Sequence, residues 1–213
     1  MMSSHRSKLK LGILGSGRGS NFIAIADAIE RGALVAEIVL VGSDFAEAPI
    51  LTEARKRGLR TYASPPSQLK TKLEAEIERA FAEQLEQAEV ELVVFAGFMR
   101  IVREPLLNAF SGRMLNLHPS LLPAFKGLRA WEQALAAGVR TTGCTVHWVN
   151  EELDGGPIVA QEEVPVLEGD TPASLHQRIQ KAEHALLPAV LQKIALGEIA
   201  LVNPKRVSYS VSD

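Results

Sequence analysis

The amino-acid sequence predicts a Rossmann-like α/β fold, with a mainly parallel sheet, helices on both faces, and an antiparallel strand pair towards the C-terminus. Over the first two thirds, short β-rich runs alternate with segments of helical periodicity, which is the pattern of βαβ units with right-handed crossovers. The run L-V-V-F-A at 92–96 is entirely apolar, as expected for a central strand covered on both faces. After about residue 140, the polar loop E-E-L-D-G-G-P joins two β-rich runs, and so short a connection favours an antiparallel pair.

The individual elements follow from local start and stop signals. The run L-K-L-G-I-L at 9–14 is the first strand, and the glycine-rich turn after it leads into a helix over 21–31 that Gly32 ends. Gly58 ends a helix over 49–57, and Thr171 with Pro172 opens a long helix over 172–195. The other predicted strands cover 36–41, 59–62, 92–96, 114–118, 141–149 and 158–166. The other predicted helices cover 67–88 and 106–110.

Length and composition predict one domain with irregular ends. A chain of 213 residues with 46% hydrophobic residues can bury a substantial core, and its 23% charged residues match the average of soluble globular proteins. We expect a disordered N-terminal extension over 1–7, a single domain over 8–203 and a mobile tail over 204–213. The start, M-M-S-S-H-R-S-K, lacks the apolar stretch of a signal peptide, and no apolar run reaches the ~18 residues of a membrane span.

Charge and cysteine content restrict the partners and the compartment. The net charge is −2, with acidic and basic residues interspersed, whereas binding to a nucleic-acid backbone requires a basic stripe. We therefore expect small-molecule partners, without nucleic acid or membrane. The single cysteine, Cys144, excludes an internal disulfide framework and suits a reducing compartment, which predicts a cytoplasmic protein. Its apolar surroundings predict a buried thiol rather than a catalytic one.

The glycine-rich stretch G-S-G-R-G-S-N at 15–21 lies between the first strand and the first helix. Glycines allow the backbone to approach an anion, and the free amides at a helix start point towards it, so the stretch predicts a phosphate site with Ser20 and Asn21 as side-chain donors. Two alternatives remain open. A dinucleotide fingerprint would need glycine where Ser20 stands, although Asp44 near the end of the second strand keeps a ribose-binding role possible. The stretch is also compatible with a tight turn that binds no ligand.

Asn116 and His118 are the strongest catalytic candidates. They alternate with Leu115 and Leu117 in M-L-N-L-H-P, and residues two apart in a strand face the same side at roughly 7 Å. The strand ends where open α/β sheets bind their ligands. An amide can donate to a developing oxyanion, and a histidine can donate a proton or charge to it. A core histidine and a turn-forming asparagine are the structural alternatives.

Asp154 is the best candidate for a third polar group that tunes the histidine. It stands in E-E-L-D-G-G-P, where Gly155 and Gly156 permit a sharp turn. An aspartate before two glycines is also an ordinary turn signal, and spacing alone favours that interpretation. Zinc binding is a weaker alternative, because neither a cysteine pair nor an H-x-x-x-H helix accompanies these residues.

Together with three further segments, these stretches resemble the phosphoribosylglycinamide formyltransferase family. The matching segments are G-S-G-R-G-S-N at 15–21, A-G-F-M-R-I-V at 96–102, M-L-N-L-H-P-S-L-L-P-A-F-K-G at 114–127, T-G-C-T-V-H-W-V at 142–149, E-L-D-G-G-P-I-V-A-Q at 152–161 and A-E-H-A-L-L-P at 182–188. They span nearly the whole chain in the family's order. The resemblance implies the formyltransferase fold. It also implies transfer of a formyl group from the co-substrate 10-formyltetrahydrofolate to the amine of 5-phosphoribosylglycinamide, in de novo purine (IMP) synthesis.

The resemblance further implies the residues of the site. Asn116, His118 and Asp154 match the catalytic trio. The residues that match the ribonucleotide site are Gly19, Ser20, Asn21, Gln180, Lys181, Ala182 and Glu183, of which Glu183 matches the acid that holds the ribose hydroxyls. The residues that match the folate site are Lys72, Met99, Arg100, Ile101, Val102, Asn116, His147, Asn150, Glu151, Glu152, Leu153 and Asp154. Lys72 stands where the family often has an arginine.

In the implied reaction, the amine attacks the formyl carbon and a tetrahedral oxyanion forms. Asn116 and a protonated His118 stabilise that oxyanion, and Asp154 assists. The reaction requires no metal and no covalent intermediate. We expect a monomer or a homodimer.

Three rival classes share parts of this pattern. A methionyl-tRNA formyltransferase normally carries a further C-terminal domain and a basic surface, and a formyltetrahydrofolate deformylase usually has an N-terminal regulatory domain. A non-catalytic nucleotide-binding module would use the glycine loop alone. The length of 213 residues and the net charge of −2 favour phosphoribosylglycinamide formyltransferase.

Overall fold

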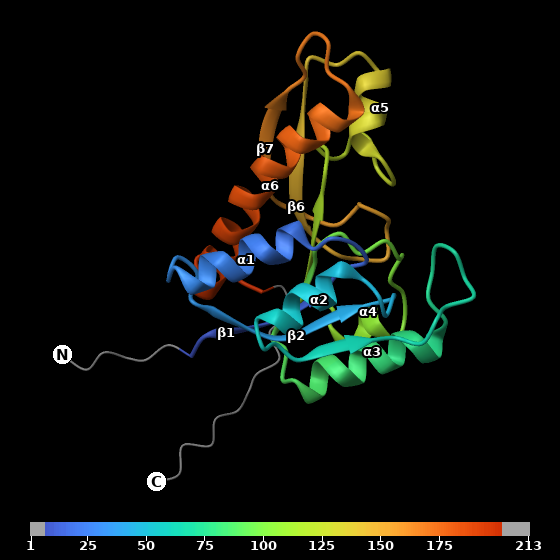
Figure 1. The fold of residues 1–213 in the computed structure, drawn as a ribbon, viewed down its shortest axis with the longest axis vertical. Coiled ribbons are helices and arrows are strands. Elements are labelled where there is room, and N and C mark those ends of the chain that lie inside the picture. The colour runs from blue at the N-terminus through green and yellow to red at the C-terminus, as the bar shows by residue number, and fades with distance from the viewer. Residues whose placement is uncertain (1–6, 202–213) are drawn as a thin grey trace, which may run out of the picture.

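The computed structural model describes residues 7–201, which form a seven-stranded sheet with helices on both sides (Figure 1). The strand order is β3-β2-β1-β4-β5-β6-β7. The strands are β1 (Leu9–Leu14), β2 (Ala36–Ser43), β3 (Thr61–Ala63), β4 (Leu92–Phe95), β5 (Met114–His118), β6 (Thr141–Trp148) and β7 (Ile158–Pro165). The helices are α1 (Ser20–Glu30), α2 (Pro49–Lys56), α3 (Ala75–Gln87), α4 (Leu106–Ala109), α5 (Ala130–Ala136) and α6 (Pro172–Ala195).

The sheet is parallel on one side of β5 and antiparallel on the other. β1 pairs in parallel with β2 and β4, and the pairs β2–β3 and β4–β5 run in the same sense. The pairs β5–β6 and β6–β7 are antiparallel. The predicted fold class is confirmed, although the antiparallel part has three strands because β5 belongs to both halves. β5 is therefore the strand at which the two halves of the sheet join.

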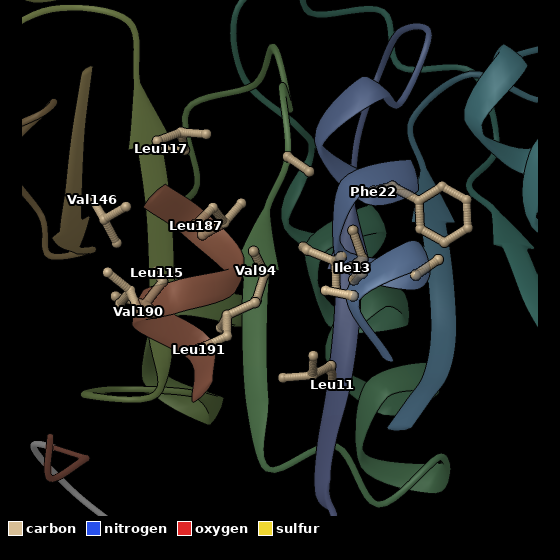
Figure 2. Close-up of a cluster of buried hydrophobic side chains, with 14 of the residues drawn as sticks. Leu11, Ile13, Phe22, Val94, Leu115, Leu117, Val146, Leu187, Val190 and Leu191 are labelled. Atoms are coloured by element: carbon tan, nitrogen blue, oxygen red, sulfur yellow. The ribbon is translucent and has the colours of Figure 1, made fainter. Parts of the chain in front are cut away.

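Alternate residues of the central strands face two separate hydrophobic cores. Leu92 and Val94 of β4 lie in the core formed with α1, α2 and α6, whereas Val93 and Phe95 lie in the core formed with α3 and α4. Figure 2 shows α6 against β4 and β5 in the first core, with Leu187, Val190 and Leu191 turned to the sheet. Burial of each such side chain contributes roughly 1.5–3 kcal/mol, so this packing fixes the strands whose ends carry the site.

The region before α3 differs from the prediction. An amphipathic pattern predicted a helix from residue 67, but α3 begins at Ala75 and residues 64–74 form a loop. The Ile101 N–H donates to the Thr71 carbonyl oxygen at 2.8 Å, and Lys72 forms a parallel bridge with Ile101. This tertiary pairing overrides the helical pattern, so the predicted helix over 67–74 was wrong.

The helix α5 was not predicted, because its seven residues give too short a periodic pattern. It is attached to α6 by a face-to-face stack of Trp131 on His176, with ring centroids 3.7 Å apart and planes 4° from parallel. α5 follows the loop after β5, so this stack holds the far end of that loop.

The predicted extension over 1–7 and tail over 204–213 lie, apart from Ser7, outside the described residues. None of the helices within residues 7–201 combines the length and the apolar character needed to cross a bilayer.

Candidate active site

The C-terminal half of β5 presents Asn116 and His118 to one face of the sheet. They alternate with Leu115 and Leu117 and share the strand face of Met114, which lies in the core formed with α3 and α4, so both polar side chains point to that face. The antiparallel register sets His147 of β6 opposite Asn116, and Thr145 opposite His118. Spacing along the strand therefore predicted the shared direction of Asn116 and His118 correctly.

Asp154 joins these side chains from the loop between β6 and β7. Its Oδ2 lies 3.4 Å from Nδ1 of His118, and its Oδ1 lies 3.5 Å from Nδ2 of Asn116 and 3.8 Å from Nε2 of His147. The Gly127 N–H donates to Oδ2 at 2.8 Å, which ties the loop after β5 to the same carboxylate. The Asp154 side chain is 8% exposed. One carboxylate thus contacts every predicted catalytic group.

The backbone at Asp154 and Gly156 forms a tight turn beside the end of β6. Asp154 has a positive φ of 47°, a conformation that aspartate tolerates better than most residues. At Gly156, a Cβ atom would come within 1.8 Å of the Trp148 carbonyl oxygen. Only glycine allows the loop to pass so close to the end of β6. The turn interpretation therefore applies, and the turn directs the Asp154 carboxylate towards Asn116 and His118.

His147 is a neutral acceptor in this cluster. Its Nδ1–H donates to the Trp148 carbonyl oxygen at 2.9 Å, which leaves Nε2 to accept from the Asn116 amide at 3.1 Å. Burial lowers the pKa of His147, in keeping with a neutral ring. The bond fixes the Asn116 amide with its NH₂ towards His147 and Asp154. Only the family resemblance pointed to His147, because the β5–β6 register cannot be read from spacing.

His118 meets a second acceptor across its ring. Its Nε2–H donates to the Phe125 carbonyl oxygen at 2.9 Å, and the ring is 4% exposed. Phe125, in the loop after β5, has a positive φ of 57°. The buried hydroxyl of Ser120 donates to the Ala124 carbonyl oxygen at 2.6 Å and helps to hold this loop in place. The His118 ring is thus held between a carboxylate and a loop carbonyl.

Thr145 of β6 and Gln161 of β7 hold the loop after β5 through hydrogen bonds to its backbone. The Thr145 hydroxyl donates to the Ser120 carbonyl oxygen at 2.6 Å and accepts from the Leu122 N–H at 3.1 Å. The Gln161 amide donates to Thr145 Oγ1 at 2.9 Å and to the Leu122 carbonyl oxygen at 3.0 Å. Sequence reasoning missed both residues, since neither belongs to a motif with a chemical signature.

A cavity of about 100 Å³ opens beside the cluster. Its walls include the predicted folate residues Arg100, Ile101, Val102, Asn116, His147, Asn150, Glu151, Glu152, Leu153 and Asp154. They also include Phe95, Phe98 and Val149, which the sequence did not suggest. The lining thus combines aromatic and aliphatic side chains with polar and charged ones, a mixture that suits a heteroaromatic ligand with hydrogen-bonding groups.

Two predicted folate residues do not line this cavity. Met99 is 58% exposed, and its backbone N–H donates to Ser16 Oγ at 2.9 Å. Lys72 is exposed and contributes its backbone to the bridge with Ile101. The structure therefore places both beside the wall rather than in it.

The glycine-rich loop supports the start of α1. Gly19 is the N-cap, with a φ of 75°, and a Cβ there would come within 2.7 Å of the Ile50 side chain. A Cβ at Gly15 would meet the Ala96 carbonyl oxygen at 2.9 Å. A Cβ at Gly17 would meet no atom within 4 Å, so packing does not require glycine there. Close packing thus explains two of the glycines, and a free helix start remains for an anion.

Glu183 of α6 lies against this loop. The Asn21 Nδ2 donates to Glu183 Oε2 at 3.0 Å, and this bond links residues that are 162 positions apart. Glu183 is 5% exposed, and burial raises the pKa of its carboxyl group, an effect that the Asn21 bond opposes. The structure thus brings together Asn21 and Glu183 of the predicted ribonucleotide set. Gln180, Lys181 and Ala182 precede Glu183 on α6.

A larger hollow of about 320 Å³ lies beside the glycine-rich loop at 15–21, between α1 and α6. Its lining residues are Ser20, Ile23, Ala24, Asp27, Arg31 and His184. The clustered groups on β5 and β6 do not line it, so we assign the chemistry to the smaller cavity.

Two alternatives from the sequence can be compared with the geometry. Among residues 7–201, no group of three or more His, Cys, Asp or Glu side chains is arranged to hold a metal ion. Cys144 is fully buried, and burial raises the pKa of its thiol to about 12, as expected for an inert thiol.

Residues 9–191 match the family described as "Formyl transferase". The chain is 40% identical over 185 residues to the phosphoribosylglycinamide formyltransferase of Bacillus subtilis (strain 168), which covers 87% of this chain and 94% of that protein. It is 44% identical over 203 residues to the trifunctional purine biosynthetic protein adenosine-3 of Gallus gallus, covering 95% of this chain. The chain spans only about a fifth (20%) of the length of that trifunctional protein. Among solved structures, glycinamide ribonucleotide transformylase 1 from Symbiobacterium toebii superimposes with a TM-score of 0.88 and 40% identity, over 96% of this chain and 95% of that one.

Proposed function

The chain belongs to the phosphoribosylglycinamide formyltransferase family, and we propose that it transfers the formyl group of 10-formyltetrahydrofolate to the amine of 5-phosphoribosylglycinamide. The products are the N-formyl ribonucleotide and tetrahydrofolate, as a step of de novo purine synthesis. The observation that carries this proposal is the convergence of Asn116, His118 and Asp154, of which Asn116 and Asp154 also line the cavity of about 100 Å³.

The two substrates occupy neighbouring sites in this proposal. The pterin of the donor lies in the cavity of about 100 Å³, between the wall at 100–102 and the loop at 150–154. The ribonucleotide phosphate lies at the start of α1, on Gly19, Ser20 and Asn21. Glu183 holds the ribose hydroxyls, with Gln180, Lys181 and Ala182 beside it on α6. In this arrangement the amine lies beside the formyl group, and such proximity supplies much of the rate.

Hydrogen bonding at the cluster supports transfer through a tetrahedral oxyanion. The amine attacks the formyl carbon, and the negative charge develops on the formyl oxygen. His118 donates to that oxygen in place of the Phe125 carbonyl, and the Asn116 amide provides a second polar group. Asp154 stabilises the charged imidazole and, through Gly127, keeps the loop after β5 in position. Each donor of this kind typically contributes about 3–4 kcal/mol to the transition state.

We also propose the remaining properties that the sequence predicts. The chain acts on small molecules, without nucleic acid, membrane or metal, in the cytoplasm, as a monomer or homodimer. Residues 8–203 form its single domain. The interspersed charges and the single cysteine support these assignments.

Turnover with both substrates tests the function directly. We expect the purified chain to produce tetrahydrofolate, with the accompanying absorbance change, only when 5-phosphoribosylglycinamide is present. Asn116→Ala and His118→Ala should each lower kcat by about 10²–10³-fold. Phosphate-free glycinamide riboside should be a poor substrate, because it loses the contacts to the loop at 19–21. A chain that hydrolyses the donor without an acceptor would instead be a deformylase, and one without turnover a binding module.

A further inference from the structure

We propose that Asp44 is a positioning residue for the formyl-donor site, and that it acts by holding Arg100 and, through Arg100, the loop at 69–72. Asp44 follows β2, and Arg100 follows β4. β1 lies between these two strands in the sheet. The Asp44–Arg100 pair therefore spans the end of β1 at the edge where the cavity opens.

The Arg100 guanidinium donates to three protein acceptors through Nε and Nη1. Its Nε–H donates to Asp44 Oδ2 at 2.6 Å, and its Nη1 donates to the carbonyl oxygens of Leu69 at 2.5 Å and Lys70 at 2.8 Å. The side chains of Arg100 and Asp44 are only 16% and 6% exposed, so water and salt screen the pair weakly. Arg100 thus lines the cavity while its Nε and Nη1 atoms are held by protein acceptors.

The loop at 69–72 connects Arg100 to the cavity wall, because it contacts both Arg100 and Ile101. Leu69 and Lys70 are held by Arg100, and Thr71 and Lys72 hold Ile101 through the 2.8 Å hydrogen bond and the parallel bridge. Ile101 and Val102 line the cavity. Asp44 therefore controls the wall through a continuous set of contacts, although it does not line the cavity itself.

The burial of Asp44 makes it dependent on this one partner. Its Oδ1 is buried and has no hydrogen-bond partner among residues 7–201. A carboxylate so placed is stable only while Arg100 compensates its charge, and removing either partner leaves an unpaired buried charge. Asp44 is thus committed to Arg100, which leaves no role for it as a ribose-binding acid of a dinucleotide site.

This inference rests on the proposed function for the identity of the donor, but the contacts do not depend on it. Loosening the wall at 100–102 should weaken donor binding and leave the chemistry at β5 intact. The expected signature is a higher KM for the donor with unchanged kcat and unchanged KM for the ribonucleotide. A merely structural role would instead lower the melting temperature without such a split.

The test compares Asp44→Asn and Asp44→Ala with the parent chain. We expect the Kd for tetrahydrofolate, measured by calorimetry, and the KM for 10-formyltetrahydrofolate to rise about tenfold in Asp44→Asn. The asparagine oxygen can still accept from Arg100, so Asp44→Ala should show the larger effect. Hydrogen exchange at 69–72 should accelerate in both variants, and this readout needs neither activity nor a ligand.

Asp170→Asn is the matched control. Arg178 donates to both carboxylate oxygens of Asp170, at 2.7 and 2.9 Å, and to the Pro165 carbonyl oxygen at 3.0 Å, so the chain contains another aspartate–arginine pair that also ties down a backbone carbonyl, and neither residue lines the donor cavity. Its loss should leave donor affinity unchanged. Unchanged donor affinity and unchanged exchange at 69–72 in both Asp44 variants would overturn the inference. Faster exchange at 69–72 in the Asp44 variants than in the parent chain, together with a parent chain that binds no folate, would instead remove the proposed function and leave the anchoring role in place.

Discussion

Replacement of Asp154 by asparagine should retain both substrates and remove most of the turnover. Asparagine has the same shape and tolerates the φ of 47° found at this position. Its amide oxygen can still accept from the Gly127 N–H, so the loop after β5 stays attached. The variant therefore removes one negative charge and little else.

The size of the effect follows from the distances. A carboxylate and an imidazolium separated by 3.4 Å attract by about 4–5 kcal/mol at an effective dielectric constant of about 20. The amide dipole of asparagine retains part of this attraction. We therefore expect a loss of about 3–4 kcal/mol of transition-state stabilisation, which corresponds to roughly 10²–10³-fold in kcat.

Steady-state kinetics with each substrate varied in turn measures this effect, and equilibrium binding of both substrates checks that affinity is retained. Glu163→Gln, which neutralises an exposed acid on β7, is the control for the loss of one charge. A kcat for Asp154→Asn within about threefold of the parent, with unaltered affinities, would remove Asp154 from the mechanism.

Three further predictions concern buried ionisable groups. Burial raises the pKa of Glu183, so its ionised form opposes folding above the usual carboxyl pKa of about 4.3; Glu183→Gln should raise the free energy of unfolding at pH 8 by on the order of 1 kcal/mol and weaken ribonucleotide binding. Urea titrations that give equal stability for parent and variant would contradict this. Burial lowers the pKa of His147, so the unfolded chain binds more protons below about pH 6.5, and stability should fall from pH 7.5 to pH 5 by less in His147→Gln than in the parent. An identical fall in both chains would refute it. Cys144, with its pKa raised to about 12, should react with a thiol reagent at pH 8 only after denaturation, and rapid labelling of the native chain would show that the thiol is accessible.

Local signals predicted most of the fold because they agree with the tertiary structure at most elements. The 172–195 helix was predicted with its observed bounds, since Thr171 and Pro172 mark its start and its apolar residues face the sheet. The helix predicted over 67–88 begins only at Ala75, so its first part was wrong. The pairing of residues 71 and 72 with Ile101 is a long-range interaction that leaves no local pattern in the sequence. Short-range patterns thus define the elements, and contacts between distant segments decide some of their ends.

The site divides in the same way. Strand periodicity alone predicted that Asn116 and His118 share a face, and the strand end predicted where they lie. The link from Asn21 to Glu183 and the role of Asp44 depend on segments far apart in the chain, and only the fold brings those segments together. Spacing favoured an ordinary turn at Asp154, because an aspartate before two glycines is a common turn signal. The sequence could not show that this turn also directs the carboxylate towards Asn116 and His118.

The antiparallel register of β5 and β6 makes the site sensitive to the parity of strand length. Side chains alternate between the faces of a strand, so deletion of one residue between 141 and 145 would turn His147 away from Asn116. Trp148, now in the core formed with α6, would take its place, and the imidazole would enter that core at the position of Val146. Deletion of two residues would keep each side chain on its present face of the sheet and would change only which residues of β5 and β6 lie opposite each other. Insertions and deletions in this half of the molecule are therefore tolerable in the loops. Within β6 they are tolerable as pairs of residues, but a single inserted or deleted residue would disrupt the site.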